Sequence, residues 1–240
     1  MITLNVIHRT FHIGWNDTTG TGFTIDHNSK QYLVTARHVL DGIESGNVIN
    51  IFYENEWKDL PINVVGIGIG DVDVTVLSSP VRLSPPIPLA ASSENLIYSQ
   101  PVYFLGYPFG WDAGGEQINH GVPLPFVKAG IVSAVEFSDV LRIYLDAQGN
   151  KGFSGGPVVF VPHGQPKNEL LVAGVVSYYP TPQFLPIVDH SGVEITNQGG
   201  NPIGYIKENP GFVVAIGIKH ALDLINANPI GFELPDDEVS

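Results

Sequence analysis

Short apolar runs separated by turn-forming residues constrain the fold of this chain more than any other feature. The runs Tyr32–Val34, Val74–Leu77 and Val158–Val161 are rich in β-branched and aromatic residues, and glycine, proline, asparagine or aspartate divides such runs along the whole sequence. Long segments with a helical period of 3.6 residues are nearly absent, so the pattern predicts a mostly β protein. The 27 glycines and 19 prolines in 240 residues supply the turns that many short strands need.

One segment late in the sequence has the periodicity of a helix instead. In Ile218–Asn226 the apolar residues recur at positions that would share one helical face, and Asn228-Pro229 follows as a stop signal. Many strands followed by a terminal helix fit a pair of Greek-key barrels. The length by itself permits one or two domains.

The run Gly149–Pro157 holds Ser154 between glycines, just before the apolar run Val158–Val161. A serine hydroxyl is a weak nucleophile at neutral pH, so catalysis needs a general base within hydrogen-bond reach and donors aimed at the developing oxyanion. Because Gly152 lacks a Cβ, it can adopt conformations in which its own N–H and that of Ser154 converge on one point. The run is a candidate nucleophile site, and a glycine-rich turn between strands is the alternative.

An imidazole and a carboxylate that could complete such a site lie upstream. His38 follows the β-branched run Tyr32–Thr35, and Asp73 precedes the run Val74–Leu77, so both stand at strand ends, where functional residues often lie. Asp71 and Asp73 would face the same side of a strand because they are two residues apart. Spacing therefore does not choose between the two aspartates.

The candidate residues sit within short motifs that follow one another along the chain. The three blocks around them are Thr35-Ala36-Arg37-His38-Val39, Asp73-Val74-Thr75-Val76-Leu77 and Gly152-Phe153-Ser154-Gly155-Gly156-Pro157. The remaining blocks are Gly20–Ile25, Phe104–Gly110, Ala129–Ala134 and Gly174–Tyr178. In this order the blocks resemble those of the trypsin-like serine peptidases, in particular the bacterial HtrA-like branch. The order His, Asp, Ser is that of the chymotrypsin type.

The resemblance implies a mostly β, chymotrypsin-like fold of two packed six-stranded Greek-key β-barrels with a C-terminal helix. The domains it implies are a first barrel over residues 1–95, a second barrel with the helix over residues 96–228, and an acidic tail over residues 229–240. The first barrel would carry His38 and Asp73, and the second barrel would carry Ser154.

The reaction implied is peptide-bond hydrolysis through a triad of His38, Asp73 and Ser154 and an acyl-enzyme intermediate. The N–H groups of Gly152 and Ser154 would form the oxyanion hole, and the family pattern favours Asp73 over Asp71. The resemblance also implies a set of uncharged substrate-binding residues, namely Ala147, Gln148, Gly149, Ser177, Tyr178 and Tyr179. We therefore expect a neutral or small apolar residue before the cleaved bond, because a strong preference for Arg or Lys needs an acidic pocket floor.

Phe153, directly before the serine, departs from the family pattern of Asp or Asn. Phenylalanine cannot form the ion pair with a newly cut N-terminus, so activation by N-terminal cleavage is not expected. A large apolar side chain beside the oxyanion loop keeps open the alternative of a catalytically silent scaffold that binds a peptide or partner protein. A further alternative is an α/β-hydrolase-type esterase, in which Asp189 and His220 would follow Ser154 in the order of that family.

The formal net charge of −13, with 11 Lys and Arg residues, argues against a nucleic-acid partner because phosphate binding needs clustered cations. No apolar run is long enough for a transmembrane helix, and the first residues lack the features of a signal peptide, so a cytoplasmic protein without membrane contact is expected. The chain has no cysteine and no histidine-based ligand motif, so we expect no metal and no cofactor. The expected partners are a protein or peptide substrate and a regulatory protein that acts, for example, by ordering loops.

Overall fold

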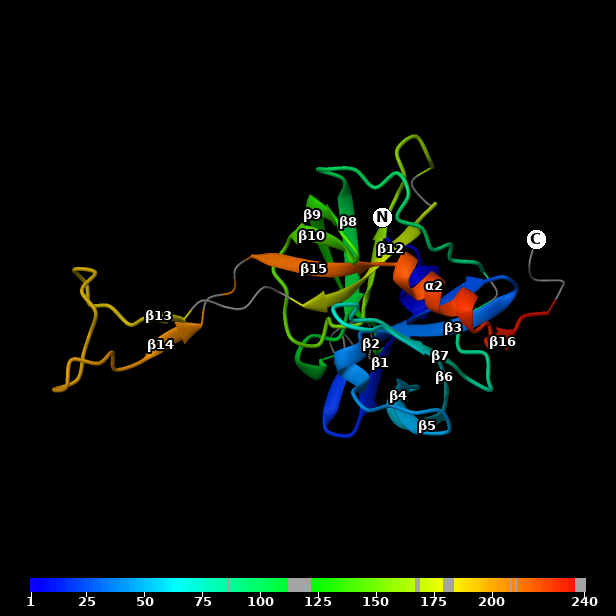
Figure 1. Ribbon diagram of the computed structural model, residues 1–240, viewed down its shortest axis with the longest axis horizontal. Helices are drawn as coiled ribbons and strands as arrows, with labels where there is room; N and C mark the ends of the chain where they lie inside the picture. The colour runs from blue at the N-terminus through cyan, green and yellow to red at the C-terminus, as the bar shows by residue number, and fades with distance from the viewer. Residues whose placement is uncertain are drawn as a thin grey trace.

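Two antiparallel sheets dominate the structure, a computed structural model (Figure 1). It describes residues 1–85, 87–111, 122–166, 169–178, 184–207, 209 and 211–235, without the side chains of Tyr178 and Lys207. The prediction of a mostly β protein is confirmed. The first sheet comes mainly from the first 80 or so residues, and the second follows in sequence.

The strands of the first sheet follow the spatial order β5-β4-β1-β2-β3-β7-β6. They are β1 (Thr10–Trp15), β2 (Thr18–His27), β3 (Lys30–Thr35), β4 (Val48–Tyr53), β5 (Glu56–Pro61), β6 (Asn63–Ile67) and β7 (Thr75–Ser78). The short strand β16 (Phe232–Glu233) also pairs with β3. The sheet curls into a half-barrel whose two ends, β5 and β6, are not paired with each other.

The second sheet closes into a barrel of six strands in the order β10-β15-β12-β11-β8-β9. They are β8 (Pro101–Gly106), β9 (Phe126–Phe137), β10 (Leu141–Asp146), β11 (Pro157–Phe160), β12 (Leu171–Tyr178) and β15 (Phe212–Gly217). All four residues of β11 are buried, as an uninterrupted apolar run predicts for a strand covered on both faces. The nucleophile run Gly149–Pro157 is thereby the connection from β10 into β11.

A shared apolar core joins the two sheets. Phe23, Val34 and Val76 of the first sheet lie in one cluster of buried side chains with Val175 and Ile216 of the second. Each sheet has in addition a cluster of its own. The junction between the sheets is therefore packed apolar surface, and burial of such surface is the main stabilising term in folding.

Helix α2 (Lys219–Ala227) matches the predicted helix to within one residue at each end. Its residues Ala221 and Ile225 are buried in the shared core, on the face that the periodicity predicts. The other helical segments are short: α1 (Leu4–His8), and the 3-10 turns η1 (Arg37–Leu40) and η2 (Pro108–Gly110).

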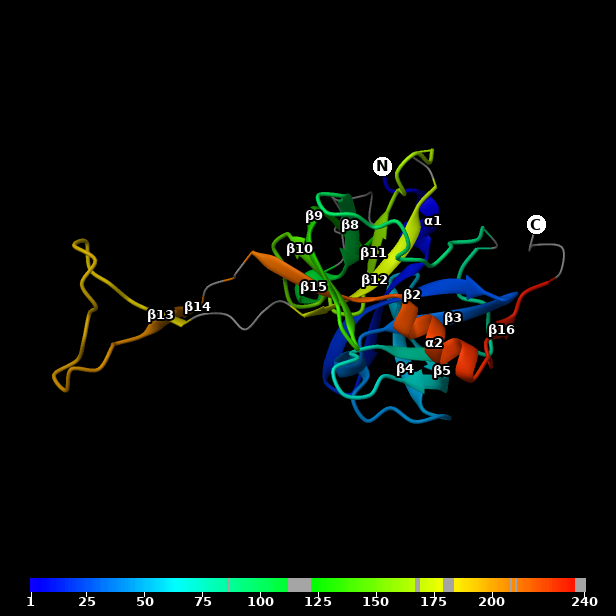
Figure 2. The ribbon, with the colours of Figure 1, turned by 45° about the horizontal axis from the view of Figure 1, so that its top comes forward.

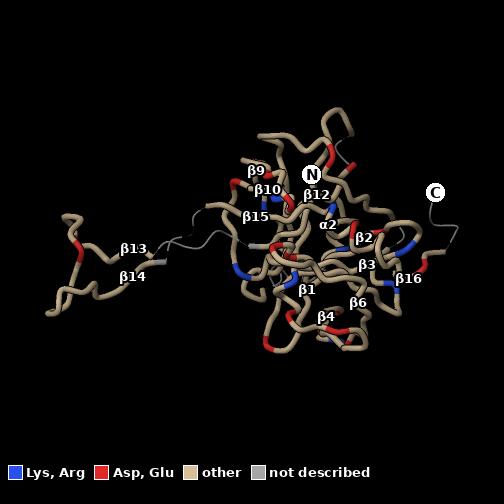
Figure 3. Tube along the Cα trace, viewed as in Figure 1, with Lys and Arg blue, Asp and Glu red and all other residues tan. Residues whose placement is uncertain are grey.

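A hairpin formed by β13 (Phe184–Pro186) and β14 (Tyr205–Lys207) projects from the body of the molecule between β12 and β15 (Figures 1 and 2). Lys and Arg are scattered over the chain trace rather than gathered on one face (Figure 3). Over the described ranges, no helix has the length and apolar character needed to cross a membrane. The same part of the chain contains no group of three or more His, Asp or Glu side chains arranged to hold a metal ion.

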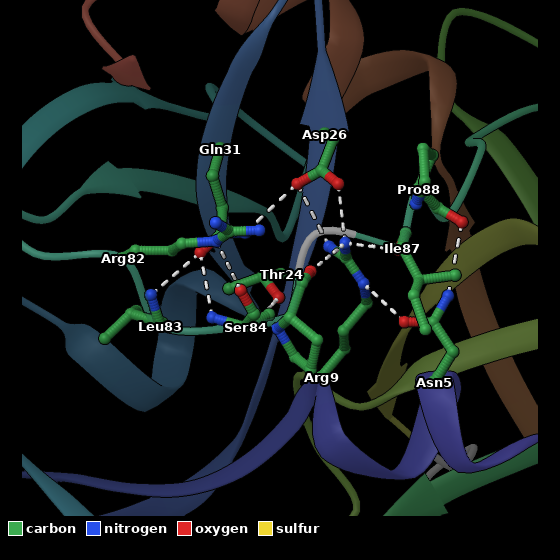
Figure 4. A network of polar contacts seen from close by, with 11 residues as sticks. Asn5, Arg9, Thr24, Asp26, Gln31, Arg82, Leu83, Ser84, Ile87 and Pro88 are labelled. Atoms are coloured by element: carbon green, nitrogen blue, oxygen red, sulfur yellow. Dashed lines mark hydrogen bonds and ion pairs between the residues drawn. The ribbon is translucent and has the colours of Figure 1, made fainter. Parts of the chain in front are cut away.

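A buried guanidinium ties the N-terminal segment to the first sheet (Figure 4). The side chain of Arg9 is fully buried, and its two terminal nitrogens donate to the two carboxylate oxygens of Asp26 at 3.0 and 2.5 Å. The same guanidinium donates to the carbonyls of Pro85 and Ile87, and its Nε donates to Asn5. The network therefore joins α1, β2 and the segment that leads to the second sheet.

Replacing Arg9 by Met should lower the free energy of unfolding by about 3 to 5 kcal/mol, because the Asp26 carboxylate loses its cation and keeps only the donor from Gln31, and the carbonyls of Pro85 and Ile87 lose the Arg9 donor. Urea denaturation measures this loss. The control is Lys58→Met, which removes a partly exposed cation paired with Glu54 and should leave the urea midpoint nearly unchanged. Equal midpoints for the Arg9 variant and wild type would contradict a stabilising role of the network.

Candidate active site

The nucleophile turn has a conformation that only glycine tolerates at its centre. Gly152 has φ +102°, and a Cβ there would lie 2.2 Å from the carbonyl oxygen of Tyr107. Two residues on, Ser154 Oγ donates to the carbonyl oxygen of Ser177 on β12 at 3.2 Å. The close approach of backbone at Gly152 explains why the sequence has a glycine before the serine at this spacing.

His38 and Asp73 lie together at the ends of neighbouring strands. His38 is in η1, directly after β3, and Asp73 precedes β7, which pairs with β3. Asp73 Oδ2 accepts from His38 Nδ1 at 2.7 Å, and Oδ1 accepts from the backbone N–H of His38 at 3.0 Å. Two hydrogen bonds from His38 to one carboxylate hold the imidazole in one orientation. Nε2 is then the ring nitrogen that does not contact Asp73.

Ser177 connects the nucleophile turn to this pair. Its hydroxyl donates to Asp73 Oδ2 at 2.5 Å, while its carbonyl accepts from Ser154 Oγ. Ser177 therefore contacts Ser154 through its backbone carbonyl and Asp73 through its hydroxyl, and these contacts bring the nucleophile turn and the His38–Asp73 pair together. Sequence reasoning named Ser177 as a substrate-binding residue and missed its contact with the carboxylate, because the two residues are 104 positions apart.

Arg37 and Asp71 lie near Asp73 in sequence or in the fold and have partners of their own. The guanidinium of Arg37 donates to the carbonyls of Gly68 and Gly70, so it ties the turn that carries His38 to the loop before Asp73. Asp71 is exposed and accepts from Arg142 at 2.8 Å. Within the structure, Asp73 is thus the aspartate that contacts His38, while Asp71 pairs with a cation on β10.

The electrostatics of the site favour an ionised Asp73. Burial by itself would raise the pKa of this carboxyl, but the hydrogen bond and charge interaction with His38, and the donors of Ser177 and the His38 backbone, outweigh it. The net result is a pKa below the usual value for Asp. A permanent carboxylate beside Nδ1 is what a triad requires of its acidic member.

The predicted oxyanion donors, the N–H groups of Gly152 and Ser154, have no competing acceptor within the described part of the chain. Among the hydrogen bonds of the described residues, neither the N–H of Gly152 nor that of Ser154 donates to a protein atom. The carbonyl of Lys151 accepts from the N–H of Phe109 at 2.8 Å. Because a trans peptide is planar, the N–H of Gly152 points away from that contact. This arrangement leaves both N–H groups available to a substrate carbonyl.

Comparison with known families decides the affiliation of the chain. The model of the trypsin-like peptidase domain matches residues 20–180, which is more than half of the sequence. The chain belongs to the trypsin-like peptidase family. A comparison with curated protein sequences found no match.

Solved structures of bacterial peptidases share the fold of this peptidase domain. The Rv3671c protease of M. tuberculosis, in an inactive form, is 17% identical with a TM-score of 0.56, over 94% of this chain and 90% of that one. The HtrA-type protease AlgW is 19% identical with a TM-score of 0.58, over 93% of this chain and 61% of that one. A serine endoprotease from Yersinia pestis is 17% identical with a TM-score of 0.56, over 93% and 64%. The predicted chymotrypsin-like fold is confirmed, with the correction that only the second sheet closes into a six-stranded barrel, while the first is an eight-stranded half-barrel.

A small cavity of about 10 Å³ opens beside Ser154 of the peptidase domain. This is room for about one water molecule. Its lining is uncharged and consists of Gly149, Asn150, Phe153, Ser154, Val176, Ser177 and Val213. Of the predicted substrate-binding residues, Gly149 and Ser177 line the cavity. Ala147 and Gln148 lie outside the lining, Tyr178 is in β12 without a described side chain, and Tyr179 lies outside the described residues.

Lys128, which sequence reasoning missed, holds the segment 148–150, which contributes Gly149 and Asn150 to the cavity wall. Lys128 Nζ donates to the Gln148 carbonyl at 2.5 Å and to Asn150 Oδ1 at 2.6 Å, and burial lowers the pKa of this amine. Asn209 Nδ2 donates to the Gly149 carbonyl at 2.7 Å. No local motif in the sequence marks either residue, because both reach the wall from distant segments.

Phe153 anchors the nucleophile turn through apolar contact. Its side chain is 1% exposed, and its ring meets that of Phe104 edge to face with centroids 5.2 Å apart. The ring belongs to the apolar cluster in the core of the second barrel. Burial of an aromatic ring thus fixes the position that the family fills with Asp or Asn.

The alternative of an α/β-hydrolase is wrong, because both large sheets are antiparallel and the nucleophile turn leads into a strand. Its two proposed partners are also engaged elsewhere. Asp189 accepts from the backbone N–H groups of Ser191 and Val193 within the projecting hairpin. His220 Nε2 accepts from the N–H of Leu141, and burial, followed by the charge of Lys219, lowers the pKa of this imidazole.

The stability that the Asp73 carboxylate provides should depend on pH in one direction. Since its pKa is lowered in the folded state, the contribution is complete above the usual Asp pKa and is lost as pH falls through the folded value. The difference in unfolding free energy between wild type and Asp73→Asn should therefore be constant near neutrality and shrink below about pH 4. Denaturant titrations at a series of pH values measure it.

Ser177→Ala is the matched variant for this measurement. It removes one donor to the carboxylate and so moves the folded pKa of Asp73 back toward the usual Asp value. The stability that the carboxylate provides near neutrality should therefore be smaller than in wild type, and its loss on acidification should be complete at a higher pH. A difference between wild type and Asp73→Asn that grows on acidification would contradict the lowered pKa.

Proposed function

We propose that this chain is a serine endopeptidase with Ser154 as nucleophile, His38 as general base and Asp73 as the group that orients the imidazole. The observation that carries the proposal is that Ser177 contacts both Ser154 and Asp73, while Asp73 accepts from His38 Nδ1, so that the three predicted residues gather around one residue of β12. Family membership supports the same class of reaction. The HtrA-type protease AlgW has been solved with a tripeptide and a decapeptide, which agrees with a peptide ligand for this fold.

In the proposed reaction, Ser154 Oγ rotates away from the Ser177 carbonyl and attacks the carbonyl carbon of the scissile bond. His38 Nε2 takes the hydroxyl proton, and Asp73 stabilises the resulting imidazolium. The oxyanion of the tetrahedral intermediate accepts from the N–H groups of Gly152 and Ser154. The carbon–nitrogen bond then breaks as the imidazolium gives its proton to the leaving amine, which leaves the acyl group on Ser154.

Water completes the cycle by the same route. His38 accepts a proton from a water molecule that attacks the acyl carbon, and the second tetrahedral intermediate uses the same two donors. Its collapse breaks the ester bond, returns the proton to Ser154 Oγ and releases the carboxylate product.

We propose that the residue before the cleaved bond is small and apolar. The cavity beside Ser154 measures about 10 Å³ in this structure, and Val176 and Val213 give it an apolar lining. Asp146 is exposed at the end of β10 and is not part of the lining, so no carboxylate lines the cavity among the residues that the structure describes. The Lys128 amine, which bonds Asn150 of the wall, further disfavours Arg or Lys.

A catalytically silent scaffold is the second candidate, and one observation favours it. The hydroxyl of Ser154 donates to the Ser177 carbonyl rather than to an imidazole nitrogen in this structure. Under the first candidate this contact is a resting state that a substrate or a regulatory partner changes. Covalent labelling of Ser154 separates the two candidates.

A fluorophosphonate probe should label wild type on Ser154, whereas Ser154→Ala and His38→Ala should give no labelling, because the nucleophile or its base is missing. Asp73→Asn should slow labelling by about ten-thousand-fold, since the imidazole loses the carboxylate that orients it. Asp71→Asn is the matched control, because its carboxylate contacts Arg142, and it should retain nearly the wild-type rate. Intact-mass spectrometry follows the modification.

Absence of labelling in folded wild type would favour the silent scaffold over the peptidase. Equal losses in the two aspartate variants would contradict the role proposed for Asp73.

A panel of peptides that differ only in the residue before the cleaved bond tests the proposed preference. Ala and Val should give the highest kcat/KM, and Leu, Phe and Arg should be cleaved at least about tenfold more slowly, because a side chain larger than the cavity must displace its walls. Faster cleavage after Arg than after Ala would overturn the proposal. Efficient cleavage of all members without any added partner would argue against regulation of the resting chain.

A further inference from the structure

Gly152 and Ser154, whose N–H groups are the proposed oxyanion donors, both have their carbonyl oxygens bonded by Thr21 of the first sheet. Thr21 lies on β2 of the first sheet, and its side chain is fully buried. Its hydroxyl donates to the Gly152 carbonyl at 2.7 Å, and its backbone N–H donates to the Ser154 carbonyl at 2.8 Å. Nothing in the predicted triad or oxyanion hole uses this residue.

The direction of every hydrogen bond at Thr21 is determined by its partners. The N–H of Tyr107 can only donate, so Thr21 Oγ1 accepts from it at 3.2 Å. The single hydroxyl proton of Thr21 is therefore donated to the Gly152 carbonyl. The Thr21 carbonyl accepts from Thr35 Oγ1 at 2.7 Å. The residue is therefore saturated, and its hydroxyl has one orientation.

These contacts act on the torsions that aim the oxyanion donors. The Gly152 carbonyl is fixed by Thr21, and the preceding carbonyl of Lys151 is fixed by Phe109 from the turn that Tyr107 begins. The two peptide planes that flank Gly152 are thereby both anchored. Because Gly152 at φ +102° has wide conformational freedom, external anchors rather than its own sterics must hold its N–H in place.

We infer that Thr21 is a positioning residue whose hydroxyl holds the peptide plane that follows Gly152, so that the torsions of Gly152 keep its N–H in the orientation that binds the oxyanion. This inference rests on the proposed peptidase function. It gives the hydroxyl a role in the transition state, since the N–H groups matter most when negative charge develops on the substrate oxygen. Substrate binding in the ground state does not require it.

Thr21→Val keeps the shape of the side chain and removes only the hydroxyl, and Thr21→Ser keeps the hydroxyl. We expect kcat to fall by about 10- to 100-fold in Thr21→Val with KM within about twofold of wild type, because a small misplacement of a catalytic donor costs this much. Thr21→Ser should restore most of kcat. The affinity for a peptide boronic acid ending in the alanine analogue should fall in parallel with kcat/KM.

Thr24→Val is the control for loss of a buried threonine hydroxyl on the same strand. Thr24 is fully buried and bonds Ser84, far in sequence from the nucleophile turn, so its variant should keep the wild-type kcat. Thermal unfolding of all variants reports stability. If Thr21→Val does not fold, Thr21→Ala is measured at low temperature in its place. Its kcat should likewise be lower than that of Thr21→Ser.

The amide signals of Gly152 and Ser154 in a ¹⁵N–¹H spectrum give a readout that needs no turnover. They should shift in Thr21→Val and stay near their wild-type positions in Thr24→Val. Unchanged signals or an unchanged kcat in Thr21→Val would overturn the inference, as would a Thr21→Ser variant no better than Thr21→Val. A wild type that neither labels nor cleaves contradicts the peptidase function, and the amide signals then still decide whether Thr21 holds the loop.

Discussion

The contact on which the site depends is the junction between strand β2 and the nucleophile turn. One sheet supplies His38 and Asp73 and the other supplies Ser154, so the relation between the two sheets sets the geometry of the site. The backbone bond from Thr21 to the Ser154 carbonyl crosses that junction directly. Around it lies the shared apolar core, which resists any relative shift of the sheets because packed interiors deform little.

Close packing along this junction explains the glycines of the two motifs. A Cβ on Gly155 would lie 1.9 Å from the Thr21 carbonyl oxygen, and one on Gly20 would lie 3.1 Å from the Ser154 carbonyl oxygen. The backbones of the two sheets thus approach more closely than any side chain permits. These motifs need glycine because a Cβ would not fit between the two backbones, as well as because glycine permits unusual backbone torsions.

Sequence reasoning reached what is encoded locally. The mostly β class, the terminal helix and the turn around Ser154 follow from short patterns, and the motif order indicated the family. The choice between Asp71 and Asp73 lies beyond periodicity, since both could face the same way. In the fold, the guanidinium of Arg142, 71 positions away from Asp71, pairs with that aspartate, while Asp73 contacts His38. The roles of Ser177, Lys128 and Val213 likewise arise from strands that meet only in the barrel, and no local spacing encodes them.

The C-terminal elements α2 and β16 pack against the first sheet, and this affects the order in which parts of the chain can fold. Strand β16 pairs with β3, the side chain of Asn228 bonds the Val65 carbonyl, and α2 buries Ile225 in the core beside Val76. The half-barrel made first on the ribosome therefore lacks part of its cover until about 150 further residues have been synthesised. Such long-range closure slows folding. We therefore expect the nucleophile turn and His38 to reach their final positions late, in the same cooperative step that completes the first sheet.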